Sequence, residues 1–337
     1  MLKMNNSENL DVRLYMAPLR GVTTAPYRNL FADWFGGVDV ALAPFISADG
    51  ISRMKRAVFT DVLPENNSAP PLIPQLIGKT PEGLLAACEV LRDLGYGEVN
   101  WNLGCPWPFV IRKRRGSGLL PHPDHICAVL DRIVPLAGCR ISIKARLGTD
   151  RPDQLVGILP ALDSYPLSGI VIHPRTAGQM YQGSVDLDAF ADCLEATRHD
   201  VIYNGDIRTG EDFRLLSGRF SGVRGWMLGR GLVADPFLAA EIRCEPVKKC
   251  ADAIRCFHDE LYGSYRERLQ RPRSLLGRMK ELWFYLSQSF SEGPAMLRDV
   301  QRSQSTRQYE SVVDAFFNRR PAVQGLRPSP VQPSISD

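Results

Sequence analysis

Short apolar runs recur through the first two thirds of the chain, and each ends in turn-forming residues before a stretch with helical spacing. The runs are 13–18, 38–45, 72–77, 98–104, 140–147, 169–173, 201–205 and 224–229. Apolar runs of this length are typical of strands that are buried on both faces. Helices are predicted between them, most clearly at 81–95, 123–136, 186–197 and 206–216, with Thr80 and Thr209 as expected caps.

Strands that alternate with helices predict a parallel sheet. Eight such units over roughly 240 residues fit a (β/α)8 TIM barrel, which typically needs about 250. A doubly wound sheet is the alternative, but it would place a GxGxxG phosphate loop after the first strand. The first strand here runs into "MAPLRGVT" instead. The predicted fold class is therefore α/β, with a TIM barrel over residues 1–245.

The pattern changes after residue 246, where helical spacing continues without further strands. Helices are predicted at 251–270 and 274–290, separated by the linker "QRPRS". We therefore expect a smaller all-α domain at 246–320. Residues 321–337 are rich in proline and serine, which predicts a disordered tail.

Composition excludes several classes of protein. A hydrophobic content of 44% with 23% charged residues is ordinary for a soluble globular protein. No window approaches the roughly 18 consecutive apolar residues of a membrane span, and no signal peptide opens the chain. The eight cysteines form no CxxC pair, which argues against a zinc site and a disulfide framework. We expect a cytoplasmic monomer with no metal, no membrane contact and no obligate protein partner.

Charge is unevenly distributed although the net charge is only +4. Residues 1–242 hold 25 lysines and arginines against 26 acidic residues, whereas residues 243–320 hold 15 against 10. A basic C-terminal part on a neutral body indicates either a polyanionic partner or a solvated helical face.

Polar residues and glycines end most of the predicted strands. In a barrel these positions meet at the carboxyl-terminal face, where chemistry takes place. The set is Ala17, Pro18, Gln75, Asn102, Lys144, Arg146, His173, Arg175, Asn204, Gly205, Asp206, Gly229 and Arg230. The glycines after the seventh and eighth strands, together with Arg230, predict a phosphate site, although each also suits a tight turn.

Three of these side chains have an ordinary structural alternative. Lys144 at a barrel mouth needs an anion, which is either a ligand or a partner at the rim. His173 is catalytic or structural. The amide of Gln75 suits the edge of a pyrimidine-like ring, or it orders a loop.

One thiol lies at a strand tip in "EVNWNLGCPWPFVIRKRRGSGLL", residues 98–120. Cys105 is followed by Pro106 and then by four consecutive cations, and no activating base is near it in the sequence. An unperturbed cysteine has a pKa of about 8.5 and stays protonated at neutral pH. The thiol is therefore better suited to donating a proton than to attacking a substrate.

The motifs "YMAPLRGVTTAPYR", "NLGCP", "IKARLG", "HPRTAGQMYQG", "NGDI" and "GRG" resemble those of the tRNA-dihydrouridine synthases in order and spacing. The resemblance covers residues 13 to 240, and the basic C-terminal part is similar to that family's RNA-binding domain. It implies FMN as cofactor, NADPH (or NADH) as reductant and uridine in tRNA as substrate. It also implies a TIM-barrel oxidoreductase in which FMN is held by Ala17, Pro18, Gln75, Lys144, His173, Asn204, Gly205, Asp206, Gly229 and Arg230.

The resemblance also implies the chemistry. Hydride passes from reduced FMN to C6 of a flipped uracil, and Cys105 protonates C5. Asn102 would contact the uracil, and Tyr181 would line the base pocket. The expected RNA contacts are Arg112, Lys113, Arg114 and Arg115 after the thiol, and Arg271, Arg273, Arg278 and Lys280 in the helical domain.

Some positions depart from the family pattern. Leu19 and Arg20 stand where Met or Glu is usual, Pro174 replaces a small residue, and Trp107-Pro108 replaces Ser-Lys or similar. Trp107 either stacks a base or covers the pocket. These departures leave the uridine position and the RNA open. The alternatives are an FMN barrel enzyme that acts on a small molecule, which would not depend on RNA, and a non-catalytic RNA-binding protein, which would bind no flavin.

Overall fold

The computed structural model describes residues 12–49 and 56–328. Its strands are all paired in parallel. They are β1 (Leu14–Met16), β2 (Val40–Leu42), β3 (Ile46–Ser47), β4 (Leu72–Ile73), β5 (Gln75–Ile77), β6 (Glu98–Leu103), β7 (Arg140–Gly148), β8 (Ile170–Thr176), β9 (Val201–Tyr203) and β10 (Gly225–Leu228).

Proline interruptions explain why ten short strands stand where eight runs are predicted. Pro44 separates β2 from β3 and Pro74 separates β4 from β5, because proline has no N–H for the ladder. β4 pairs with β2 while β5 pairs with β6, so the predicted strand 72–77 bridges its two neighbours. β10 pairs with β1, and the ladder therefore runs around a barrel.

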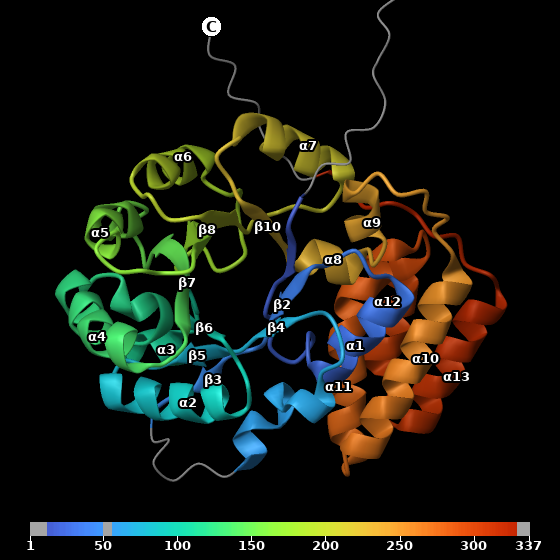
Figure 1. Ribbon diagram of the computed structural model, residues 1–337. Helices are drawn as coiled ribbons and strands as arrows, with labels where there is room; N and C mark the ends of the chain where they lie inside the picture. The colour runs from blue at the N-terminus through green and yellow to red at the C-terminus, as the bar shows by residue number, and fades with distance from the viewer. Residues whose placement is uncertain (1–11, 50–55, 329–337) are drawn as a thin grey trace, which may run out of the picture.

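Helices surround this sheet, as Figure 1 shows. They are α1 (Ala25–Trp34), α2 (Pro81–Asp93), α3 (Pro108–Arg112), α4 (Pro123–Leu136), α5 (Gln154–Leu162), α6 (Leu187–Glu195), α7 (Gly210–Arg219), α8 (Arg230–Ala234) and α9 (Leu238–Ile242). Between β3 and β4, the described residues form 3-10 turns, Arg56–Val62 and Pro64–Asn66, in place of an α-helix.

The expected caps differ in their contacts. Thr209 caps α7 in a capping box, where its side chain accepts from the N–H of Asp212 and the Asp212 carboxylate accepts from the N–H of Thr209. Thr80 precedes α2 as predicted, but its side chain makes no capping hydrogen bond.

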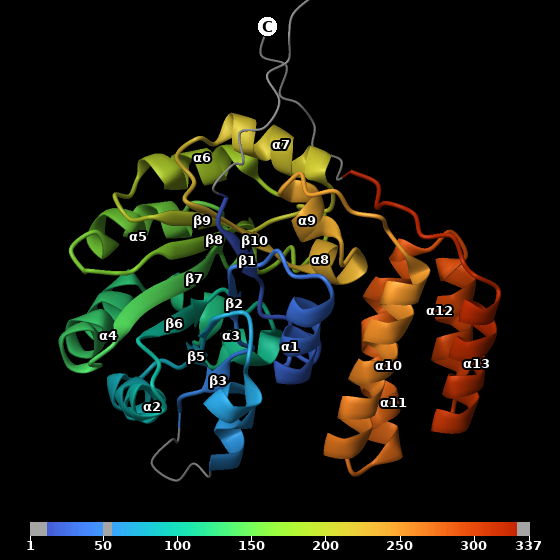
Figure 2. The ribbon, with the colours of Figure 1, turned by 45° about the vertical axis from the view of Figure 1, so that its right-hand side comes forward.

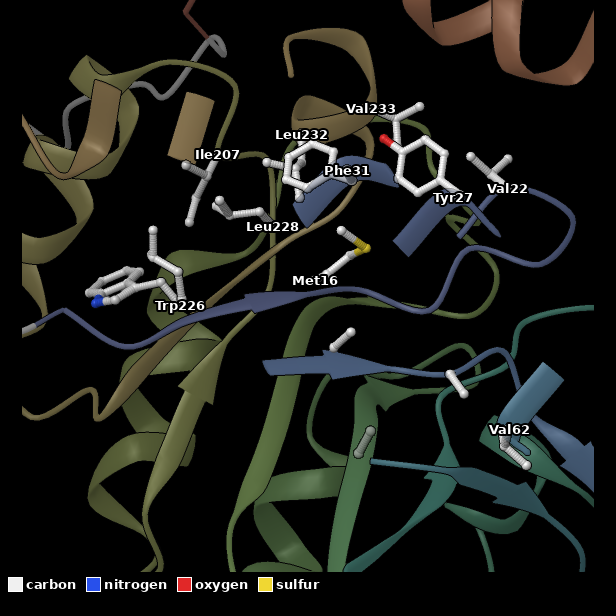
Figure 3. Packing of buried hydrophobic residues seen from close by; sticks show 14 of the residues in the cluster. Met16, Val22, Tyr27, Phe31, Val62, Ile207, Trp226, Leu228, Leu232 and Val233 are labelled. Carbon is white, nitrogen blue, oxygen red and sulfur yellow. The ribbon is translucent and has the colours of Figure 1, made fainter. Parts of the chain in front are cut away.

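Strand alternation divides the barrel core into two layers. Outward-facing residues such as Met16 of β1 pack against α1 and α8, and Figure 3 shows Tyr27, Phe31 and Leu232 around that side chain. Inward-facing residues form a smaller apolar cluster of Tyr15, Ala17, Val40, Leu42, Val171, Ile202 and Met227. The two faces of one strand therefore serve two cores.

The C-terminal part is helical, as predicted, but it holds more helices than the sequence indicated. These are α10 (Ala251–Arg268), α11 (Pro272–Leu286), α12 (Gly293–Arg302) and α13 (Thr306–Asn318). They stand beside the barrel in Figure 2. Their contacts with it include α10 on α1 and α11 on α8. α11 begins two residues earlier than predicted, so Arg273 lies in its first turn and not in the linker.

Residues 321–328 differ from the prediction of a disordered tail. Val323 forms an antiparallel bridge with Phe290, and the N–H of Gln324 donates to the carbonyl of Ser289 at 2.7 Å. Backbone pairing of this kind orders a segment that is too polar and proline-rich to predict as a strand. The rest of the predicted tail, 329–337, lies outside the described residues.

Two kinds of feature are not found in the described part of the chain. No helix there is long and apolar enough to cross a bilayer. No group of three or more His, Cys, Asp or Glu side chains there is arranged to hold a metal ion.

Candidate active site

A cavity of about 1490 Å³ opens at the carboxyl ends of the barrel strands. The predicted cofactor, base and catalytic residues all line it, although they come from separate strands: Ala17, Pro18, Gln75, Asn102, Cys105, Lys144, His173, Tyr181, Asn204, Gly205, Asp206, Gly229 and Arg230. One wall belongs to the helical part, through Ser274, Arg278, Glu281, Phe284, Tyr285 and Gln288 of α11 and the turn after it. The site therefore lies between the barrel and α11.

The loop that carries Cys105 is fixed by its neighbours. The side-chain oxygen of Asn102 accepts from the N–H groups of Gly104 at 3.0 Å and Cys105 at 2.8 Å. The hydroxyl of Ser117 donates to the carbonyl of Cys105 at 2.8 Å. A Cβ on Gly116, where φ is +57°, would lie 2.8 Å from the Cβ of Cys105. The GSG motif is therefore needed for the chain to fold back against the cysteine.

The surroundings of the Cys105 thiol shift its pKa. Burial raises the pKa of Cys105 above its ordinary value, although the guanidinium of Arg146 acts to lower that pKa. This direction agrees with the prediction of a proton donor, because a thiol with a raised pKa keeps its proton at neutral pH.

Hydrogen-bonded amide side chains form a row at the floor of the cavity, the end that lies inside the barrel. Gln75 donates to the side-chain oxygen of Asn100 at 2.8 Å and accepts from Asn102 at 2.8 Å, and Asn100 donates to the hydroxyl of Ser142 at 3.0 Å. These bonds orient Gln75 and Asn102 from below. Each amide group can make further hydrogen bonds, so both remain able to contact a ligand.

Several cationic side chains also lie at the floor of the cavity. Burial and the nearby charge of Arg146 lower the pKa of Lys144 to about 7. Among the described residues, only burial and the charge of Arg146 act on the Lys144 ammonium, and no carboxylate or hydrogen-bond acceptor pairs with it. Burial also holds the pKa of His173 well below its usual range, and the charges of Arg146 and Lys144 act in the same direction. His173 is therefore neutral, and the floor favours an anion.

Arg146 lies at a predicted strand end, but the sequence analysis assigned it no role in the site. Its Nε donates to the carbonyl of Gly104 at 3.1 Å and its Nη1 to the carbonyl of Thr176 at 2.7 Å. Its Cζ lies 5.1 Å from the ring centroid of Tyr181. Arg146 thus ties the cysteine loop to β8 and supports Tyr181, while burial lowers its pKa to about 10.

Asp206 organises the region after β9. Its carboxylate accepts from Arg175, at 3.0 Å from Nη1, and from Arg230 at 3.0 Å. The Cζ of Arg230 also lies 4.9 Å from the centroid of Tyr181. Arg230, the cation predicted to bind a phosphate, is therefore partly neutralised by Asp206. The sequence analysis gave no role to Arg175, the buried partner that holds this carboxylate.

The glycines of the predicted phosphate site are not equivalent. A Cβ on Gly205 would lie 2.9 Å from Val185, so packing alone requires glycine there. A Cβ on Gly229 would meet only Ala17, at an ordinary 3.5 Å. Gly229 directly precedes the first turn of α8, and packing within the protein does not require a glycine there. The space that its missing side chain leaves faces the cavity and is available to a ligand.

The cations predicted to contact RNA fall into two groups. Arg112, Lys113, Arg114, Arg271 and Arg273 are exposed.

The other three have partners in the fold. Arg115 is an internal ion-pair residue, since its Nη1 lies 3.0 Å from Asp49 and 3.0 Å from Ser47. Lys280 donates to the carbonyls of Gln301 and Ser303 at the end of α12, and Arg278 donates to the carbonyl of Gly21. Their positions in the sequence gave no sign of these contacts, which depend on distant segments.

Comparison with known proteins identifies the family of this chain. The family model described as "Dihydrouridine synthase (Dus)" matches residues 15–317. A probable tRNA-dihydrouridine synthase of Rhodobacter capsulatus is 29% identical over 239 residues, 70% of this chain and 72% of the relative. A tRNA-dihydrouridine(16) synthase of Ralstonia nicotianae is 27% identical over 321 residues, 91% of this chain and 97% of the relative.

A structure of a morphinone reductase mutant in complex with tetrahydroNAD has a TM-score of 0.49 and 11% identity, covering 70% of this chain and 88% of that chain. The family match spans both the barrel and the C-terminal helices, including α11, which forms one wall of the cavity. The chain belongs to the dihydrouridine synthase family.

Proposed function

We propose that this protein reduces uridine in tRNA to 5,6-dihydrouridine, with FMN as cofactor and NADPH as reductant. The observation that carries the proposal is the placement of one protonated thiol, Cys105, in a cavity whose floor gathers cations and oriented amides. The family match supports the same reaction.

The residues present fit a flavin mononucleotide. Lys144 is a cation without a partner among the described residues, and an anionic ring edge would satisfy it. The amide of Gln75 can donate and accept toward a ring edge, while Gly229, Arg230 and the start of α8 suit a phosphate. Ala17, Pro18, His173, Asn204, Gly205 and Asp206 complete the proposed binding set. When bound, FMN supplies the hydride that reduces C6 of the uracil.

The chain's own groups supply the rest of the chemistry. Cys105 gives its proton to C5, and the thiolate that remains is stabilised by the positive charge of Arg146. Asn102 holds the cysteine loop in place and has a further N–H available for the uracil. The ring of Tyr181 lies near the guanidiniums of Arg146 and Arg230, and its exposed part, 43% of the side chain, would contact the base.

We further propose position 16 of tRNA as the target. The Ralstonia relative, named for that position, aligns over 91% of this chain and therefore over most of the helical part. That part forms a wall of the cavity through α11, so it decides how an RNA can approach. The exposed cations Arg112, Lys113, Arg114, Arg271 and Arg273 would contact its phosphates. We expect the protein to act as a monomer in the cytoplasm.

The test begins with the visible spectrum of the purified protein. NADPH oxidation is then followed with unmodified tRNA transcript, with a transcript carrying C16 in place of U16, and without RNA. Dihydrouridine is measured by mass spectrometry. The proposal expects a yellow protein that forms dihydrouridine only when U16 is present. A yellow protein indifferent to RNA would indicate a small-molecule oxidoreductase. A colourless protein that takes up no FMN would contradict the flavin assignment.

A further inference from the structure

Exposed aromatic side chains gather around the catalytic cavity. Among the described residues, Trp107, Phe109, Tyr181 and Phe284 are the aromatics more than two-fifths exposed. Three of them, Trp107, Tyr181 and Phe284, line the cavity, and Phe109 follows Trp107 by two residues. Single exposed apolar residues are ordinary on a protein surface, but a group around one cavity marks a surface for a ligand.

The proposed chemistry uses only Tyr181 of this group, and among the other three Trp107 stands nearest the catalytic thiol along the chain. Its side chain is 53% exposed, although it stands only two residues after the buried thiol of Cys105. It therefore does not cover the pocket as a packed residue would. Among the described residues its indole N–H makes no hydrogen bond, whereas that of Trp101 donates to the carbonyl of Gly78 at 3.1 Å.

The backbone under Trp107 is fixed. It lies between Pro106 and Pro108, with φ −65° and ψ 130°, immediately before α3. Its carbonyl accepts from the N–H groups of Val110 at 2.8 Å and Ile111 at 3.0 Å. A large ring on a rigid backbone loses little conformational entropy when it binds a flat partner.

We propose that Trp107 is a stacking platform for an unpaired base next to the uridine that enters the cavity. This rests on the proposed function, and it makes Trp107 a positioning residue for single-stranded loop RNA. Base–aromatic stacking is sequence-tolerant, so the platform would hold the strand without reading the neighbouring base.

The surroundings of Trp107 suit an RNA strand. Arg112, Lys113 and Arg114 follow it as exposed cations on and after α3. The ammonium of Lys113 lies 4.1 Å from the ring centroid of Phe109, which fixes a positive charge beside the aromatic surface. A paired base would not present a free face to the indole, so the arrangement favours an opened loop over a duplex.

The test compares Trp107→Ala and Trp107→Phe in the full-length flavin-loaded enzyme. Leu136→Ala is the matched control, because Leu136 is 60% exposed but does not line the cavity. We expect Trp107→Ala to raise the KM for unmodified tRNA about 10- to 100-fold, in line with roughly 1–3 kcal/mol per stacked base. Its kcat and flavin content should stay near wild type. Trp107→Phe should recover most of the affinity, and Leu136→Ala should change nothing.

Fluorescence supplies a readout that a structural role would not move. Trp101, Trp226 and Trp283 are buried, and Trp34 is half-buried away from the cavity, where its indole N–H donates to Glu260 at 3.2 Å. Quenching of tryptophan emission by added tRNA would therefore come mainly from Trp107. Trp107→Phe should remove this quenching and Trp34→Phe should keep it. An unchanged KM in Trp107→Ala, or quenching that persists in Trp107→Phe, would overturn the inference. Failure of the proposed function is distinguishable, because the wild-type enzyme itself would then leave tRNA unreduced.

Discussion

Two buried histidines show how differently the two parts of the molecule treat polar groups. In the helical part, His258 bonds through Nδ1 to Asp259 at 2.8 Å and through Nε2 to the hydroxyl of Tyr309. Trp283 donates to the same hydroxyl at 2.8 Å. In the barrel mouth, the hydrogen bond that His173 makes within the described residues is a long 3.3 Å contact with Arg175, itself a cation.

The difference separates a stabilising network from a binding surface. The groups around His258 satisfy one another, so they hold α10, α11 and α13 together without a ligand. The groups around His173 are mostly cations, and their charges oppose one another. A fold retains such an arrangement where an anionic ligand relieves it, and changes in the two regions should therefore have opposite effects on stability and activity.

The largest effect is expected from removing the thiol. Cys105→Ala should lower kcat for dihydrouridine formation by about 10²- to 10⁴-fold, the usual contribution of a general acid. Flavin content and thermal stability should change little, because the loop is held by Asn102 and Ser117 and not by the sulfur. Absorbance at the flavin bands, a thermal melt and single-turnover kinetics measure the three quantities. Activity at the wild-type rate would remove Cys105 from the mechanism.

The helical part should respond in the opposite way. Tyr309→Phe removes the hydroxyl that serves both His258 and Trp283, leaving two buried groups without that partner. We expect a loss of about 1–3 kcal/mol in the free energy of unfolding and unchanged kcat in the enzyme that remains folded. Urea denaturation followed by tryptophan fluorescence gives the first value. Equal stability would show that the network does not hold these helices together.

Lys144→Met should weaken FMN binding while stabilising the flavin-free protein. Burial lowers the pKa of Lys144 from 10.5, its value in an unfolded chain, to about 7 in the folded protein. Between pH 7 and pH 10.5 the unfolded chain therefore keeps a proton on this lysine that the folded chain has released. The lysine therefore destabilises the fold most at and below pH 7, and less as the pH rises toward 10.5. Thermal melts of flavin-free wild type and variant should converge over this window. A gap that stays constant with pH would contradict the lowered pKa.

The smallest effect compares two neighbouring cations. Arg114 is exposed, whereas Arg115 is paired with Asp49. Arg114→Ala should reduce the slope of log K against log salt for tRNA binding by about one, the value for one phosphate contact. Arg115→Ala should leave that slope unchanged and lower the melting temperature. Filter binding at several salt concentrations tests both, and a shifted slope for Arg115 would return it to the RNA surface.

Much of the candidate site was predictable because, in a barrel, the position of a residue at the end of a strand also fixes the face on which it lies. The predicted strand ends all reach one cavity, since parallel strands bring their carboxyl ends to the same face. The contacts that hold the Cys105 loop are also local, because Asn102, Gly116 and Ser117 lie within fifteen residues of it, although the sequence analysis assigned Asn102 only to the uracil. Short-range patterns of this kind need only the chain's own geometry.

The tertiary structure decided which cations are available and what closes the cavity. Arg114 and Arg115 are adjacent and chemically alike, yet only the position of Asp49 makes one of them an ion-pair residue. Lys280 is taken by carbonyls at the end of α12, a helix that was not predicted. The sequence by itself determined the barrel, the polar residues at its strand ends and the helical character of the C-terminal part. The wall formed by α11 and the partner of each charge depend on contacts between distant segments. The free energies of such contacts cannot be inferred from the pattern of neighbouring residues.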